Sequence, residues 1–286
     1  MTGGVWGPSG AGTFRGAPVS AAAGGHTVSP YAAAFAAAAG RVLRRPGELA
    51  VRLLFYTVIL VVFAALWSAA AAATGGHVAG YSAAALLWYV TVAEAAVVAT
   101  KPRLIEDIGV DIGTGAVATE MLRPVSVLWL RLASELGEAA VRLAMALAIG
   151  TAFTWAVGGA PPARAGALLA LPSAVLAVAA NLAAQHAFAG AAFWLSDAKA
   201  TWFLYQKLVF LLGGMLLPLQ LFPAWLERVA WVLPFWTMAY APARLTAGSP
   251  PQPWLLAAQA AWLVVLAGAA AVVFAAGERH LEVAGG

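Results

Sequence analysis

The sequence has no cysteine and very little charge. The absence of cysteine from its 286 residues excludes disulfides, thiolate metal sites and cysteine nucleophiles. Only 10% of the residues are charged, against about a quarter in an average soluble domain. Because 63% are hydrophobic and the mean hydropathy is +0.85, the composition excludes a soluble enzyme, a disordered chain and a nucleic-acid-binding domain. It predicts an all-α polytopic membrane protein.

Several catalytic motifs are also missing. No Gly-Lys pair occurs in the sequence, so the phosphate-binding loop G-x-x-x-x-G-K-[ST] of an ATPase is absent. No G-x-S-x-G sequence occurs, and His26, His77 and His280 lack the spacing of metal ligands. We therefore predict no catalytic residue, no metal site and no cofactor bound by this chain.

The apolar residues divide into six candidate membrane spans. A span requires about 20 mostly apolar residues. Stretches near this length lie at about residues 51–73, 81–99, 132–157, 167–195, 203–221 and 254–276. The second and fifth are at the short end of this range, and the fourth is long enough to tilt or to extend beyond the bilayer.

The positive charges predict the orientation of these spans. With a cytoplasmic N-terminus, eleven Lys and Arg residues lie inside. Only Arg164, Arg228 and Arg244 lie outside, while Arg142 and Lys207 are near the inner boundary. The positive-inside rule therefore predicts a multi-pass protein of a bacterial-type cytoplasmic (inner) membrane with both termini in the cytoplasm.

The N-terminal region precedes the spans and divides into two parts. Residues 1–30 are mainly Gly, Ala, Ser and Pro, which predicts a disordered cytoplasmic leader or, alternatively, a wrongly assigned start codon. Residues 31–286 then form the six-span domain. Tyr31, Phe35 and Val42 share one helical face and Arg41, Arg44 and Arg45 another, which predicts a helix lying in the inner membrane interface. The alternative is a basic flank of the first span.

A short amphipathic helix is predicted between the second and third spans. After Pro102, three isoleucines recur at spacings of three and four residues, and acidic residues occupy the other faces. Such a helix against the membrane is what a permease needs to receive force from a cytoplasmic motor. The spacing alone favours the alternative, an ordinary interfacial helix.

The segment after the fifth span is rich in proline and aromatic residues. Pro218, Pro223, Pro234 and Pro242 exclude one continuous helix. The tryptophans and tyrosines between them suit the outer headgroup zone. We predict short broken, re-entrant helices on the extracellular side, packed against protein or lining a cavity.

Ionisable residues within the spans are costly and require partners. Arg131, Glu135, Glu138 and Arg142 share one helical face, which predicts Arg131–Glu135 and Glu138–Arg142 pairs. Glu94 lies at a depth similar to that of Arg142 on the antiparallel second span. We therefore hypothesise a Glu94–Arg142 contact, with snorkelling of Arg142 and a water-exposed Glu94 as the alternatives.

Three further polar residues are predicted near the middle of the fourth span. Asn181, Gln185 and His186 could contact a substrate in a translocation path. They could equally hydrogen-bond to a neighbouring helix, which is the favoured interpretation.

The motifs in these segments resemble those of one transporter family. Asp107-Ile108, Gly113 and Leu122-Arg123-Pro124-Val125-Ser126 are similar to the coupling region of type-2 ABC exporter permeases. Gly213-Gly214-Met215-Leu216-Leu217-Pro218, Leu221-Phe222-Pro223, Leu233-Pro234-Phe235 and Tyr240-Ala241-Pro242 are similar to its signature between the last two spans. The similarity covers about residues 31–280 and is greatest to the subgroup with two related permeases per ATPase. Gly214, where a serine is expected, and the long leader depart from the pattern.

The resemblance implies a non-catalytic permease subunit of an exporter. ATP and Mg would be bound by separate cytoplasmic ABC ATPase subunits, and a second permease would complete a homodimer or a related heterodimer in membrane lipid. The cargo would be an amphipathic or hydrophobic drug, natural product or lipid. The implied ATPase-coupling segment comprises Ile105, Glu106, Asp107, Ile108, Asp111, Ile112, Glu120 and Arg123. The implied extracellular cap comprises Pro218, Phe222, Pro223, Trp225, Pro234, Phe235 and Pro242.

Two other function classes remain as alternatives. An ion- or proton-coupled secondary transporter would need a carboxylate at the membrane centre, whereas Glu94 is off-centre and no internal repeat is visible. An intramembrane lipid-modifying enzyme would need clustered His, Asp or Glu residues at one interface, and only the residues from Arg131 to Arg142 come close to that.

Overall fold

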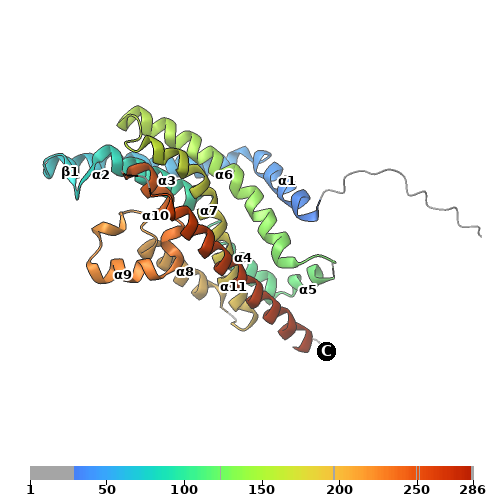
Figure 1. Cartoon of the computed structure of the whole chain (residues 1–286). Helices are drawn as coiled ribbons and strands as arrows, with labels where there is room; N and C mark the ends of the chain where they lie inside the picture. Colours follow the sequence, from blue (N-terminus) through green and yellow to red (C-terminus); the bar gives the residue numbers. More distant parts are fainter. Residues whose placement is uncertain (1–28, 123, 196, 249, 251, 285–286) are drawn as a thin grey trace, which may run out of the picture.

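The computed structural model describes residues 29–284 except 123, 196, 249 and 251. The predicted leader therefore lies almost wholly outside the described residues, as does Arg123. The described chain is mostly helical (Figure 1). Its α-helices are α1 (Pro30–Leu43), α2 (Pro46–Ala73), α3 (Ala83–Val98), α4 (Leu104–Gly113), α5 (Ala116–Met121), α6 (Val127–Gly158), α7 (Arg164–Ala189), α8 (Ala198–Leu212), α9 (Ala224–Val232), α10 (Tyr240–Ala247) and α11 (Trp254–Ala284).

Four helices are long and apolar enough to cross a membrane. They are α2, α6, α11 and α7, the last extended to Phe193 by the 3₁₀ helix η1 (Gly190–Phe193). Apolar α3 and the 15-residue α8 occupy the positions of the second and fifth predicted spans but are shorter. A multi-pass helical membrane protein is therefore confirmed, and the count of six spans stays a prediction.

One predicted span boundary is wrong. Helix α8, at the position of the fifth predicted span, ends at Leu212 instead of near residue 221, because Gly213 and Gly214 follow it and Gly214 has a φ of +64°, which favours glycine and ends a helix. The fourth candidate span, Arg164–Phe193, agrees closely with the predicted residues 167–195. His186 lies in the last turn of α7, within this span.

A two-residue hairpin connects α2 to α3. Strands β1 (His77–Val78) and β2 (Tyr81–Ser82) pair antiparallel, with Val78 opposite Tyr81. The two loop residues, Ala79 and Gly80, have φ values of +47° and +86°. The two-residue turn that best matches the twist of the flanking strands requires a positive φ at both loop positions. The hairpin is the one departure from an all-α fold among the described residues.

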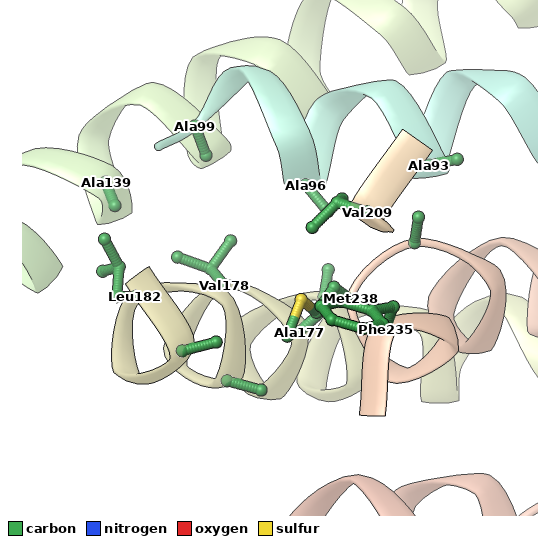
Figure 2. Packing of buried hydrophobic residues seen from close by; sticks show 14 of the residues in the cluster. Ala93, Ala96, Ala99, Ala139, Ala177, Val178, Leu182, Val209, Phe235 and Met238 are labelled. Atoms are coloured by element: carbon green, nitrogen blue, oxygen red, sulfur yellow. The ribbon is translucent and has the colours of Figure 1, made fainter. Parts of the chain in front are cut away.

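Helix α3 lies at the centre of the bundle. Its residues from Ala85 to Ala96 are all buried, and it packs against α2, α6, α7 and α10. Figure 2 shows Ala96 and Ala99 on one side of the core, and Ala177, Val178 and Leu182 of α7 on the other. Small side chains allow such close helix packing in a membrane, where the hydrophobic effect between helices is absent.

The elements segregate toward two ends of the molecule. Figure 1 shows α1, α5 and the C-terminal end of α11 on one side, and β1 and α9 toward the other. Helix α1 packs along α6, because Gly137 has no side chain where the backbone of Phe35 passes. We call the end that carries the C-terminus of α1, the start of α2 and α4 the basic end.

Candidate functional site

The predicted amphipathic helix exists as α4. Its isoleucines Ile105, Ile108 and Ile112 are buried, and the helix packs against α7, η1 and α8. On the opposite side Asp107 is exposed and Val110 has 62% of its surface accessible. The helix therefore uses one face for the bundle and leaves the other open to a partner.

Arg131 joins α4 and α5 to α6. Its guanidinium contacts Asp111 of α4 at 2.8 Å and makes a two-pronged contact with Glu120 of α5 at 2.8 and 3.0 Å. The predicted Arg131–Glu135 pair is therefore wrong. Arg131 contacts Asp111 and Glu120 on other helices instead of Glu135 on its own helix. The planar guanidinium group matches the oxygens of these carboxylates.

Helix α4 is also held against α8. Gly109 lies directly against Ala198, with no room for a side chain between them. The indole Nε1 of Trp202 donates a hydrogen bond to the carbonyl oxygen of Pro102. These contacts hold α4 close to α8. A cavity of about 290 Å³, lined in part by Ile108, Asp111 and His186, lies between α4, α5, α6 and α7.

Glu138 is the centre of an ionic cluster at the basic end. Its carboxylate contacts Arg142 at 2.6 Å, Lys101 at 3.2 Å and Arg41 at 3.3 Å. The predicted Glu138–Arg142 pair is confirmed. The Glu94–Arg142 hypothesis is wrong, because the nearer carboxylate on α6 takes the guanidinium, and no ion pair to the buried Glu94 occurs among the described residues.

Lys101 connects this cluster to a second carboxylate. Its ammonium donates a hydrogen bond to Glu135 at 2.8 Å in addition to its contact with Glu138. Burial alone would lower the pKa of Lys101, but the hydrogen bond and the negative charge of Glu135, together with Glu138, raise the pKa above its ordinary value. The lysine is therefore held in its charged form just beyond the end of α3.

The three polar residues of α7 face the protein interior. Gln185 donates to the side-chain oxygen of Asn181 at 2.9 Å, and the Tyr205 hydroxyl of α8 donates to the same oxygen at 2.5 Å. The Nδ1 atom of the fully buried His186 lies 2.8 Å from the carbonyl oxygen of Leu182. Only the bond to Asn181 from Tyr205 joins two helices, as the favoured interpretation expects, whereas the bonds of Gln185 and His186 stay within α7. A role in translocation stays untested.

The proline-rich segment is broken into short helices, as predicted. Pro218 and Pro223 immediately precede η2 (Leu219–Leu221) and α9. Pro234 begins η3 (Pro234–Thr237), and Pro242 is the third residue of α10. All four prolines lie before or within a first turn, where the backbone N–H has no intrahelical acceptor to lose.

Aromatic side chains hold this cap together. The ring of Trp231 lies 4.8 Å from that of Trp236 and 5.8 Å from that of Trp254 on α11. Phe235 is buried, Phe222 is half-buried, and Trp225 is 65% exposed. The predicted cap residues are therefore divided between an aromatic core and an exposed surface.

Gly214 shows why the expected serine is missing. Its left-handed backbone and the surrounding Leu219, Tyr89 and Tyr240 leave little room for a Cβ atom. The hydroxyl of Tyr89 donates to the carbonyl oxygen of Gly214. The backbone thus provides the polar contact to α3.

Sequence reasoning missed residues whose partners lie on other helices. Charge counting places Lys101 on the inner side, and periodicity places Arg41 on the basic face of an interfacial helix, but neither identifies Glu138, which both residues contact. Gln259 of α11, which donates to the carbonyl oxygens of Thr237 at 2.7 Å and Ser173 at 3.1 Å, was not identified at all. A polar residue in an apolar span was the available signal, but spacing within one helix cannot identify a partner on another.

The described residues of this region form connections between helices. No group of three or more His, Asp or Glu residues able to hold a metal ion occurs among them. What the arrangement can do is relate the position of α4 to α6, α7 and α8 through ion pairs and close backbone contacts.

Comparison with known proteins gave one match. A family model described as "ABC-2 family transporter protein" matches residues 53–285. No curated protein and no solved structure matches the chain.

Proposed function

Since the chain belongs to the ABC-2 family of transporter proteins, we propose that it is the membrane subunit of an exporter driven by separate ABC ATPase subunits. Membership implies an ABC ATPase partner. The chain has no phosphate-binding loop, so ATP and Mg would bind to that partner. The proposed cargo is amphipathic or hydrophobic, and the proposed complex contains a second permease, either a copy of this chain or a relative.

The observation that carries this proposal is the position of α4. Its isoleucine face packs into the bundle while Asp107 and Val110 face outward. A nucleotide-dependent groove on an ATPase would grip the outer face and pull on α6 and α8 through Arg131, Gly109 and Trp202. Such coupling requires that the nucleotide states contact α4 differently.

The orientation follows from the same proposal. The basic end would face the cytoplasm, in agreement with the positive-inside rule, and the cap of η2, α9, η3 and α10 would face outward. Alternating access would then open a path beneath the cap when the ATPases close.

The proposal is tested by changing the outer face of α4. Val110→Arg should abolish co-purification with the partner ABC ATPase and the ATP hydrolysis of that complex, while the thermal midpoint of the isolated chain stays unchanged. Val232→Arg is the matched control, because Val232 is 73% exposed but lies on α9. Equal loss in both variants, or transport by the isolated chain without an ATPase, would show that the proposal is wrong.

One observation favours an ion- or proton-coupled transporter as the second candidate. Glu94 is buried on α3 and no ion pair to it occurs among the described residues, and intramembrane carboxylates of this kind serve as ion or proton sites. Glu94→Gln distinguishes the two functions. ATP-driven export should survive this substitution, whereas transport driven by an ion gradient should be lost.

A further inference from the structure

A cavity of about 150 Å³ lies at the basic end between α1, α2, α6 and Lys101. This volume is far larger than the roughly 10–15 Å³ that one water requires. Five cationic residues line it, namely Arg41, Arg45, Arg52, Lys101 and Arg142. The only acidic residues in its lining are Glu48 and Glu138. Glu135, outside the lining, pairs with Lys101, so two positive charges are left in excess.

The positive charges of the cavity are incompletely neutralised by the protein. Arg41 and Arg142 share Glu138, and Lys101 contacts both Glu138 and Glu135. Arg52 donates its hydrogen bonds to two neutral carbonyl oxygens, those of Val98 at 3.0 Å and Thr100 at 2.9 Å. No ion pair to Arg45 occurs within the described part of the chain.

Arg142 has a second guanidinium nitrogen without a partner in the described part of the chain. The residue is only 5% exposed and lines the cavity. Its Nη2 atom is occupied by Glu138, whereas its buried Nη1 atom has no hydrogen-bond partner among the described residues. Buried donors are almost always paired, and a charged donor favours a negatively charged acceptor.

We propose that this cavity binds a phosphate group, held by the guanidinium groups of Arg142, Arg45 and Arg52. These arginines come from α6, from the junction of α1 and α2, and from α2. A tetrahedral phosphate offers acceptor oxygens in several directions, which suits donors converging from different helices. Arginine is the residue best suited to such oxygens. A planar carboxylate presents only two oxygens in one plane and matches this arrangement less well.

The same chemistry has two sources, a lipid headgroup and a soluble phosphate. The experiment uses the purified full chain in detergent, without an ATPase, so its outcome does not depend on the proposed export function. Native mass spectrometry would measure binding of phosphatidic acid, with diacylglycerol as the lipid that lacks phosphate. Calorimetry would measure binding of inorganic phosphate.

Arg45→Gln and Arg44→Gln form a matched pair. Both arginines are exposed neighbours in the sequence, but only Arg45 lines the cavity. Arg45→Gln should weaken binding of the phosphate probe about tenfold, equivalent to about 1.4 kcal/mol, while Arg44→Gln should change it less than about twofold. Arg142→Lys keeps the positive charge but replaces the forked guanidinium group with a single ammonium nitrogen. It should therefore also weaken binding of the phosphate probe about tenfold without unfolding the chain.

Each outcome decides the proposal. Binding of phosphatidic acid alone, dependent on Arg45 and Arg142, supports a lipid headgroup site, and binding of inorganic phosphate with the same dependence supports a soluble phosphate site. Equal loss in Arg44→Gln and Arg45→Gln would indicate diffuse charge attraction and overturn the proposal. It is also overturned if neither probe binds, or if Arg142→Lys binds both probes as wild type does.

Discussion

Glycines determine how closely two pairs of elements approach. Gly137 allows the backbone of α1 to lie on α6, and Gly214 forms the left-handed turn that contacts Tyr89 of α3. At Gly137 the space of a side chain is taken by the backbone of Phe35, and at Gly214 by the side chains of Leu219, Tyr89 and Tyr240. A single added carbon atom is therefore enough to test the arrangement.

We expect Gly137→Ala to destabilise the chain by about 1–3 kcal/mol, the usual cost of overpacking. The added Cβ would overlap the carbonyl group of Phe35, so α1 must shift away from α6. Gly40→Ala on α1 is the control, because no atom lies within 4 Å of its Cβ position and alanine is the better helix former. Thermal unfolding in detergent measures both changes. Equal midpoints for the two variants would contradict the close approach.

Introducing at position 214 the serine that the family pattern predicts should destabilise the chain. Gly214→Ser places a side chain on a backbone with φ of +64°, which costs about 1–3 kcal/mol in strain. Gly268→Ser, in open space on α11, should leave stability unchanged or raise it by less than about 1 kcal/mol, because serine is the better helix former. If Gly214→Ser proves as stable as wild type in the same unfolding assay, the strained turn is not required.

At the scale of elements, ionic contacts decide how α4 and α5 are held. Glu120 and Asp111 both contact Arg131, whose side chain is only 16% exposed. The Arg103–Glu106 pair of α4 instead involves an arginine that is 71% exposed. Exposed pairs contribute little because water and salt screen them, whereas breaking a shielded one leaves a charge without its partner.

Glu120→Gln should therefore lower the free energy of local opening of α5 and the end of α4 by about 1–2 kcal/mol. The expected readout is faster amide hydrogen exchange in residues 111–121, with the core of α3 unchanged. Glu106→Gln, which removes the exposed pair, should alter stability by less than about 0.5 kcal/mol. Similar exchange in the two variants would argue against Arg131 as the anchor.

At the scale of the whole molecule, Lys101 ties α6 to the end of α3. Its raised pKa means that its stabilising contribution is complete below the unfolded value of 10.5 and is lost as the pH rises through the higher folded value. The difference in unfolding midpoint between wild type and Lys101→Gln should hold constant from neutral pH upward and shrink only above pH 10.5. A difference that disappears near neutral pH would refute this assignment.

The sequence predicted the elements better than it predicted their contacts. The buried face of α4 followed from the spacing of Ile105, Ile108 and Ile112, because one helix determines that periodicity. The breaks of the cap followed from proline, which has no N–H to donate. The Lys101–Glu135 contact joins residues 34 positions apart, and nothing in local spacing encodes such a distance. The end of α8 did not follow from hydropathy, because apolar residues continue beyond Leu212 whereas Gly213 and Gly214 end the helix.

Helix α3 has a consequence for how the protein is made. Its 16 residues extend about 24 Å at 1.5 Å per residue, less than the roughly 30 Å of bilayer hydrocarbon, and its buried surface is supplied by helices that include the later α6, α7 and α10. During synthesis, α3 therefore emerges before most of its packing partners. We expect nascent chains that stop before α7 to retain α3 poorly in the bilayer and to be degraded, so that stable insertion is a late, collective event.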